Sequence, residues 1–186
     1  MPRVFIDQGH NPVNPNAGAE GNGLREQDIT YNIGQALANI LRSDPDYEVR
    51  LSRNSPTEQI GTSNSSSLAE RVREANEWGA DIFLSLHTNA FSNPSASGTE
   101  GFAYRTVGNS FRLAQNVTDQ LALITGLPNR GTFARPSLYV LRRTAMPAAL
   151  IEMGYITNPG DAALMSEQPE LFALGIYNGI MEYFGM

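Results

Sequence analysis

The sequence of 186 residues contains no cysteine and no lysine. Without cysteine, the chain can form neither a disulfide framework nor a thiolate metal site, and it has no cysteine nucleophile. All 13 basic residues are arginine, which excludes a Schiff-base lysine, a phosphate-loop lysine and a serine–lysine pair. Only 2 histidines are present, so each can be considered individually as a catalytic or metal-binding group.

Long apolar segments are also missing. No window approaches the roughly 18 apolar residues of a transmembrane helix, and the first residues lack the apolar stretch of a signal peptide. The formal net charge is −6, which disfavours a phosphate backbone as partner. We therefore expect no membrane and no nucleic-acid partner, and we expect a monomer.

Short apolar runs alternate with stretches that carry apolar residues at helical spacing. The runs predict strands over residues 4–6, 47–51, 82–86, 101–104, 137–141 and 148–151. The helical spacing predicts helices over residues 25–42, 68–79, 111–124, 161–165 and 171–183. This alternation is typical of an α/β fold. We expect a single domain over residues 1–186, with a central, twisted, mostly parallel β-sheet flanked by helices on both faces.

Both histidines follow predicted strands: His10 comes shortly after the first, and His87 ends the third. Ligands bind at the carboxyl ends of parallel strands, so both imidazoles lie at the edge where a site is expected. Glu152 ends another apolar strand at the same edge, and Glu26 heads the apolar stripe of the first helix. Two imidazoles and one carboxylate predict a metal site, and the other carboxylate would serve as general base.

Each of these side chains also has an ordinary structural explanation. His10 could bond to loop backbone, and Glu26 could stabilise a helix N-terminus by its charge. Glu20, in the polar loop of residues 11–24, could reach the same edge instead of Glu26. The spacing does not decide which acid binds the metal and which transfers protons, and no HExxH motif is present.

Several short motifs, in this order along the chain, resemble those of one enzyme family. They are Asp7-Gln8-Gly9-His10, Arg25-Glu26, Ser85-Leu86-His87-Thr88-Asn89, Glu152-Met153-Gly154-Tyr155 and Thr157-Asn158. Leu68–Asn76 resembles the second helix of that family, and Asn129-Arg130-Gly131 and Leu138–Pro147 resemble its late strands. The family is that of the zinc-dependent N-acetylmuramoyl-L-alanine amidases of type 3, and the resemblance runs from Val4 to Tyr183. Two departures, Asn11-Pro12 and Tyr155, lie beside the expected site and bear on loop shape and substrate fit.

The resemblance implies a set of roles. His10, Glu26 and His87 would bind one zinc ion per chain, and Glu152 would be the catalytic carboxylate. The implied reaction is hydrolysis of the amide bond between N-acetylmuramic acid and L-alanine of the stem peptide in bacterial peptidoglycan.

Two further residues are candidates for substrate binding. Asn89 would contact substrate or orient His87, although a cap at the strand end explains it equally well. Arg143 would meet a peptide carboxylate or the developing oxyanion, although a surface arginine is its ordinary explanation.

Two alternatives to the amidase stay open at this point. One is another zinc peptidoglycan hydrolase, such as a peptidase, and the other is an inactive peptidoglycan-binding module. We expect action at the bacterial cell wall, as an endolysin, an autolysin or a sporulation enzyme. The expected lack of a signal peptide would fit a phage-encoded enzyme released on lysis or a trimmed catalytic domain.

Overall fold

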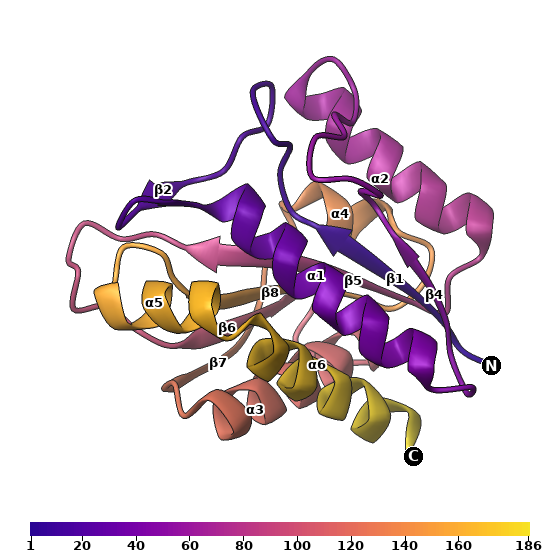
Figure 1. Ribbon diagram of the computed structural model, residues 1–186. Helices are drawn as coiled ribbons and strands as arrows, with labels where there is room; N and C mark the ends of the chain where they lie inside the picture. The colour runs from indigo at the N-terminus through magenta and orange to yellow at the C-terminus, as the bar shows by residue number, and fades with distance from the viewer.

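Six strands form the central sheet in the order β4–β1–β5–β8–β6–β7 (Figure 1). In chain order the sheet strands of this computed structural model, which describes all 186 residues, are β1 (Arg3–Gln8), β4 (Glu48–Leu51), β5 (Ile82–Asn89), β6 (Thr99–Ala103), β7 (Asn129–Ala134) and β8 (Ala148–Tyr155). β4, β1, β5 and β8 are mutually parallel, whereas β6 runs antiparallel to β8 and pairs in parallel with β7. A two-stranded hairpin, β2 (Glu20–Gly21) and β3 (Leu24–Arg25), lies outside the sheet. The expected single α/β domain with a mostly parallel sheet is confirmed.

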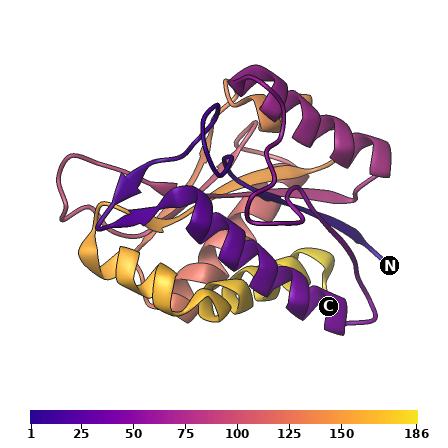
Figure 2. The ribbon, with the colours of Figure 1, turned by 45° about the horizontal axis from the view of Figure 1, so that its top comes forward.

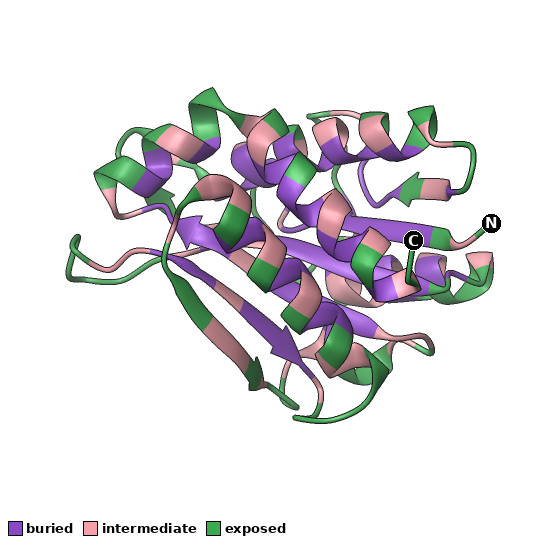
Figure 3. Cartoon of the chain, turned by 90° about the horizontal axis from the view of Figure 1, so that it is seen from below, coloured by how far each residue is buried: buried purple, intermediate pink, exposed green.

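Six helices cover the two faces of the sheet. They are α1 (Glu26–Ser43), α2 (Asn64–Trp78), α3 (Asn109–Thr125), α4 (Tyr139–Arg143), α5 (Pro159–Glu167) and α6 (Pro169–Phe184). The larger core cluster joins α1, α3 and α6 to one face, and the smaller cluster joins α2 and α4 to the other. Figure 2 shows α2 and α6 on opposite sides of the sheet. Burial is concentrated in the central strands and on the inner sides of the helices (Figure 3). None of the helices is both long and apolar enough to cross a membrane.

The helix that carries Glu26 forms where the apolar spacing predicts it. Ile29, Ile33 and Leu37 are buried against the sheet, and Glu26 lies at the head of the same stripe. Helix α2 begins four residues earlier than expected, at Asn64. Its polar first turn is stabilised by a capping box between Ser63 and Ser66, so a serine-rich stretch that resembles a loop becomes a helix start.

Two elements after α3 differ from the expectation. Residues 137–141, predicted as a strand, belong mostly to the one-turn helix α4, in which Val140 and Leu141 are buried against the α2 face. A short apolar run does not distinguish a strand from a buried turn of helix. Strand β7 covers Asn129–Ala134, so Asn129-Arg130-Gly131 lies in a late strand as expected. The expected strand character of Leu138–Pro147 is wrong, because this segment contains α4 and no strand. β7 is a half-exposed edge strand, and its composition therefore gives little signal.

The two faces of the sheet differ in how far the apolar residues extend. On the α1/α3/α6 face, β5 is apolar at Ile82, Leu84 and Leu86, up to the buried Thr88. On the α2/α4 face, the strands change from apolar to polar toward the carboxyl ends of the parallel strands. The changes are Phe5 to Asp7 in β1, Phe83 to Ser85 and His87 in β5, Leu150 to Glu152 in β8, and Phe102 to Glu100 in β6. This polar half of one sheet face is the place for a site.

Close packing of α3 against α6 depends on a glycine. A Cβ atom on Gly179 would come within 2.5 Å of the Cα of Val117. We expect Gly179→Ala to lower the free energy of unfolding by about 1–3 kcal/mol through overpacking, although alanine is the better helix former. Urea denaturation would measure this change. Leu174→Ala, at an exposed position of the same helix, is the control and should change stability far less. A gain in stability for Gly179→Ala would contradict the close contact.

Candidate metal centre and catalytic site

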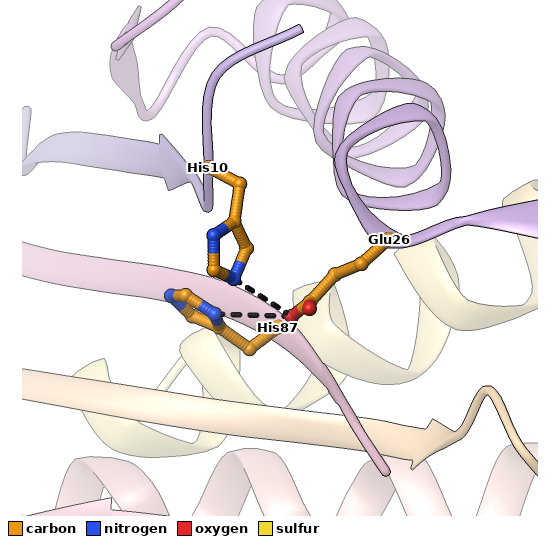
Figure 4. A group of neighbouring side chains, drawn as sticks. All are labelled: His10, Glu26 and His87. Atoms are coloured by element: carbon orange, nitrogen blue, oxygen red, sulfur yellow. Dashed lines mark hydrogen bonds and ion pairs between the residues drawn. The ribbon is translucent and has the colours of Figure 1, made fainter. Parts of the chain in front are cut away.

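Three side chains from separate elements converge at the carboxyl edge of the sheet. His10 follows β1, Glu26 begins α1, and His87 lies in β5 (Figure 4). His10 Nε2 lies 3.1 Å and His87 Nδ1 3.2 Å from the same oxygen, Oε1 of Glu26. One potential ligand atom from each residue lies within 4.8 Å of the others. The cluster can hold a metal ion, as the family resemblance implies for these three residues.

The backbone at His10 is in the left-handed region, with φ 69°. Arg71 of α2 holds this turn by donating to the carbonyl oxygen of His10 at 2.7 Å and to Oδ1 of Asn11 at 3.0 Å. Gly9 passes so close to β5 that a Cβ atom there would come within 2.6 Å of Cε1 of His87. The turn therefore needs both glycine at position 9 and the guanidinium from α2.

Glu26 is the buried acceptor at the centre of the cluster. Its Oε1 also accepts the N–H of Thr88 at 2.9 Å, and its Oε2 accepts the N–H of Ala19 at 2.9 Å. Burial by itself would raise the pKa of Glu26, but the hydrogen bonds and charge of His10 and His87 hold that pKa well below its usual range. Glu26 is therefore ionised at neutral pH, as a metal ligand must be.

The ring of His87 is held on its far side as well. Its Nε2 lies 3.1 Å from Oγ of Ser85, which donates to Oδ2 of Asp7 at 2.7 Å. Arg71 pairs with Oδ1 of Asp7 at 2.6 Å. Burial works to raise the pKa of Asp7, but the charge of Arg71 and the hydrogen bond from Ser85 outweigh it and lower that pKa. All four residues belong to one hydrogen-bonded chain below the metal cluster.

Glu152 lies on the next strand and faces the same side of the sheet. It is paired in register with His87 on β5 and with Glu100 on β6. Its Oε2 is buried and has no hydrogen-bond partner. Burial, with the negative charges of Glu26 and Glu100 adding to it, raises the pKa of Glu152 to about 8. A carboxyl group with such a pKa can both accept and donate a proton near neutral pH.

A second group of residues lies beside Glu152: Glu100, which the sequence did not single out, and Tyr155 and Arg130, which belong to the family-like motifs. Glu100 accepts the hydroxyl of Tyr155 at 3.0 Å and pairs with Nε of Arg130 at 2.6 Å. The guanidinium of Arg130 lies 5.3 Å from the centre of the Tyr155 ring. The change from apolar Phe102 to Glu100 along β6 is the one signal that could have indicated Glu100.

The other candidates lie outside the metal cluster. Glu20 is exposed in the small hairpin and is not part of it. Asn89 lies two residues beyond His87, and its Oδ1 accepts only the N–H of Ala90. Arg143 is exposed on α4, and its carbonyl oxygen accepts from Asn76 near the C-terminus of α2. Helix α4 comes just before the amino end of β8, whereas the metal cluster lies at the carboxyl ends of the parallel strands. Arg143 is therefore not brought to the cluster.

Comparisons with known proteins match nearly the whole chain to enzymes of one family. Residues 4–182 match the family model described as N-acetylmuramoyl-L-alanine amidase. The amidase CwlM of Bacillus licheniformis is 33% identical over 190 residues, covering 100% of this chain and 70% of that protein. The amidase LytC of Bacillus subtilis is 34% identical over 97% of this chain, which spans only 35% of that longer protein. The solved catalytic domain of CwlV from Bacillus (Paenibacillus) polymyxa superposes with a TM-score of 0.87 at 31% identity, covering 100% of this chain and 99% of that one.

The Arg71–Asp7 pair should be costly to break from one side. Arg71→Leu would leave the buried carboxylate of Asp7 without its cation, and we expect a loss of about 3–5 kcal/mol in the free energy of unfolding. Arg73→Leu removes an exposed arginine two residues away and should change little. Chemical denaturation of both variants measures the difference, and equal stabilities would contradict a role for the buried pair.

The raised pKa of Glu152 predicts a pH-dependent cost in the metal-free protein. An acid whose pKa rises from 4.5 to about 8 on folding holds its proton more tightly in the folded state, so its contribution to stability is lost as the pH rises between those values. Glu152→Gln removes this ionisation. With metal removed by a chelator, we expect Glu152→Gln to melt at a higher temperature than the wild type at pH 9.

At pH 5 this advantage of Glu152→Gln should shrink, because the wild-type carboxyl group is then protonated in the folded chain. Glu77→Gln, at an exposed position of α2, serves as the control and should show no such pH-dependent gain. A Glu152→Gln variant less stable than the wild type at pH 9 would contradict the buried, unpartnered carboxyl group.

Proposed function

The chain belongs to the N-acetylmuramoyl-L-alanine amidase family, and from this premise we propose that His10, Glu26 and His87 bind one zinc ion and that Glu152 transfers the proton. The reaction of this family is hydrolysis of the amide bond between N-acetylmuramic acid and L-alanine in peptidoglycan. The observation that carries the proposed roles is the convergence of two imidazole nitrogens on one carboxylate oxygen, with an unpartnered carboxyl group on the adjacent strand.

The donor set and its spacing fit zinc. Two imidazoles and one carboxylate form a three-ligand set of the kind found in catalytic zinc sites, which keep a fourth position open. With bonds of about 2.0–2.1 Å, two ligand atoms of a tetrahedral zinc site lie roughly 3.3 Å apart. Two of the three separations, 3.1 Å from His10 and 3.2 Å from His87 to Glu26, are close to that value, and all three ligand atoms lie within 4.8 Å of one another. When bound, zinc would supply a Lewis acid that polarises the scissile carbonyl group and lowers the pKa of the attacking water.

Glu152 has the environment that a proton carrier needs. Its carboxyl group lies on the same face of the sheet as His87 on the adjacent strand, and no group of the chain forms a hydrogen bond with its Oε2. In the proposed reaction, Glu152 takes a proton from the water whose oxygen adds to the lactyl carbonyl carbon. As the C–N bond breaks, Glu152 returns that proton to the amine of L-alanine. The free carboxylate on the glycan strand and the free stem peptide are the products.

The assignment of the two acids follows from their surroundings. Glu26 accepts two backbone N–H groups and faces two imidazoles, so it stays ionised and suits a cation. Glu152 has no donor near its Oε2 and has a pKa of about 8. Two carboxylates whose environments push their pKa values apart are typical of a ligand or stabiliser on one side and an acid–base catalyst on the other.

The remaining assignments concern the extent of the domain, its partners and its substrate contacts. We propose that residues 1–186 form one catalytic domain, which the coverage of the CwlV catalytic domain supports. We propose that it acts as a monomer at the bacterial cell wall, on peptidoglycan rather than on nucleic acid or a membrane, and the net charge of −6 supports the exclusion of nucleic acid. Asn89, two residues beyond His87 on the strand, is a proposed substrate contact, whereas the position of Arg143 gives it no support.

The test is to incubate purified muropeptides with the wild type and three variants while measuring zinc per chain. We expect the wild type to hold one zinc and to release intact stem peptides that begin with L-alanine. His87→Ala should lose zinc and activity together, because two ligands cannot hold an open site. Glu26→Gln should weaken zinc binding, whereas Glu152→Gln should keep zinc and lose about 10²–10⁴-fold in kcat.

Products distinguish the alternatives. Cleavage within the stem peptide would indicate a peptidase, and unaltered muropeptides in the presence of bound zinc would indicate a binding module. Glu77→Gln, an exposed change on α2, should match the wild type in zinc content and rate. If Glu152→Gln lost zinc and Glu26→Gln kept it, the roles of the two acids would be reversed.

A further inference from the structure

We propose that Ser85 and Asp7 are positioning residues that hold His87 in the tautomer with its proton on Nε2, which leaves the lone pair of Nδ1 free for the metal. The proposal rests on the proposed function where it concerns zinc. The tautomer itself is a property of this chain and can be measured without metal.

The direction of the hydrogen bonds follows from the groups that take part. Asp7 pairs with Arg71 at 2.6 Å, so its carboxylate can only accept. The hydroxyl hydrogen of Ser85 is therefore used in the 2.7 Å bond to Oδ2 of Asp7. That leaves only lone pairs of Ser85 Oγ for Nε2 of His87, 3.1 Å away, so Nε2 must carry the hydrogen.

This hydrogen decides what the other nitrogen of His87 can do. A neutral imidazole with its hydrogen on Nε2 presents a bare lone pair at Nδ1. Nδ1 lies 3.2 Å from Oε1 of Glu26, which also has only lone pairs to offer. Two acceptors that face each other at this distance need a positive charge between them, either a hydrogen on Nδ1 of a charged ring, which forms the hydrogen bond to Glu26 described above, or a metal ion. The Asp7–Ser85 pair therefore prepares His87 for a cation before any cation arrives.

The other histidine lacks such a control. Nδ1 of His10 is buried and has no hydrogen-bond partner, so apart from the contact of Nε2 with Glu26 this residue is held by its backbone carbonyl group, which accepts from Arg71. The chain thus orients the ring of His87 through its side chain and that of His10 through its backbone. His10 serves as an internal reference when the two rings are compared.

A matched pair of serine variants tests the proposal. Ser85→Ala removes the hydroxyl that contacts His87. Ser52→Ala removes another buried hydroxyl of the same network, one that accepts from the N–H of Gln8 at 2.9 Å and from Nη1 of Arg71 at 3.2 Å but does not touch His87. Both variants lose one buried hydroxyl in contact with the Arg71–Asp7 network, so an effect of stability alone should appear in both.

Two readouts are independent of catalysis. Imidazole nitrogen shifts of metal-free protein labelled with ¹⁵N-histidine, recorded at alkaline pH, report the tautomer of each ring. We expect His87 to carry its hydrogen on Nε2 in the wild type and in Ser52→Ala, and to show a mixture of tautomers in Ser85→Ala. Competition with a chromophoric chelator should show zinc binding about 10–100-fold weaker in Ser85→Ala and within about 3-fold of the wild type in Ser52→Ala.

A wild-type His87 with its hydrogen on Nδ1, or a Ser85→Ala variant with wild-type tautomer and zinc affinity, would overturn the proposal. Equal losses of zinc affinity in Ser85→Ala and Ser52→Ala would overturn it too, since they would indicate a general structural effect. A wild type that binds no zinc would contradict the proposed function instead, and the tautomers of the metal-free protein would still decide the role of Ser85.

Discussion

A buried ion pair between Arg71 and Asp7 fixes the positions of both imidazoles. From α2, Arg71 holds the carbonyl group of His10 in a left-handed turn with φ 69°, and through Ser85 the carboxylate of Asp7 holds the ring of His87. Taking both charges out of water costs several kcal/mol per ion, so such a pair adds little net stability compared with apolar packing. Its contribution is orientation: one guanidinium couples the loop after β1, the strand β5 and the helix α2 into a rigid support.

The two acids of the site show how position, rather than residue type, sets chemistry. Glu26 and Glu152 have the same side chain, and both belong to the carboxyl edge of the sheet. Backbone donors and imidazoles keep Glu26 ionised, whereas burial beside other acids keeps a proton on Glu152 to a pKa of about 8. Leaving Oε2 of Glu152 without a partner costs stability, and such a cost is common where a group must remain free to react.

The sequence predicted those features that arise from local periodicity. Apolar stripes located α1 and the central strands, and strand ends located His10 and His87, because parallel strands bring their carboxyl ends to one edge. The choice between Glu20 and Glu26 as ligand, and between ligand and base, came from the resemblance, since spacing says nothing about the donors around a carboxylate. Arg143 was proposed for substrate because it precedes β8 in sequence. However, β8 runs parallel to β5, so the residues just before β8 lie at the end of the sheet away from the cluster. Arg143 is close to Glu152 in sequence but lies at the other end of the strand.

The two faces of each central strand differ in sequence, and the difference indicates where the site lies. On one face Ile82, Leu84 and Leu86 of β5 remain apolar up to the buried Thr88, because α1 and the helices beside it cover this face. On the other face the apolar residues stop after Phe83, and Ser85 and His87 follow. A strand that is buried on both faces reads as a continuous apolar run, so the polarity change is hidden until alternate residues are separated. In register, the change comes at Asp7 and Ser85 in β1 and β5 and one same-face residue later, at Glu152 and Glu100, in β8 and β6. At the level of His87, Glu152 and Glu100, three neighbouring strands are polar together. Such a polar patch over buried strands reduces the hydrophobic core, and this cost, more than any single motif, indicates a functional surface.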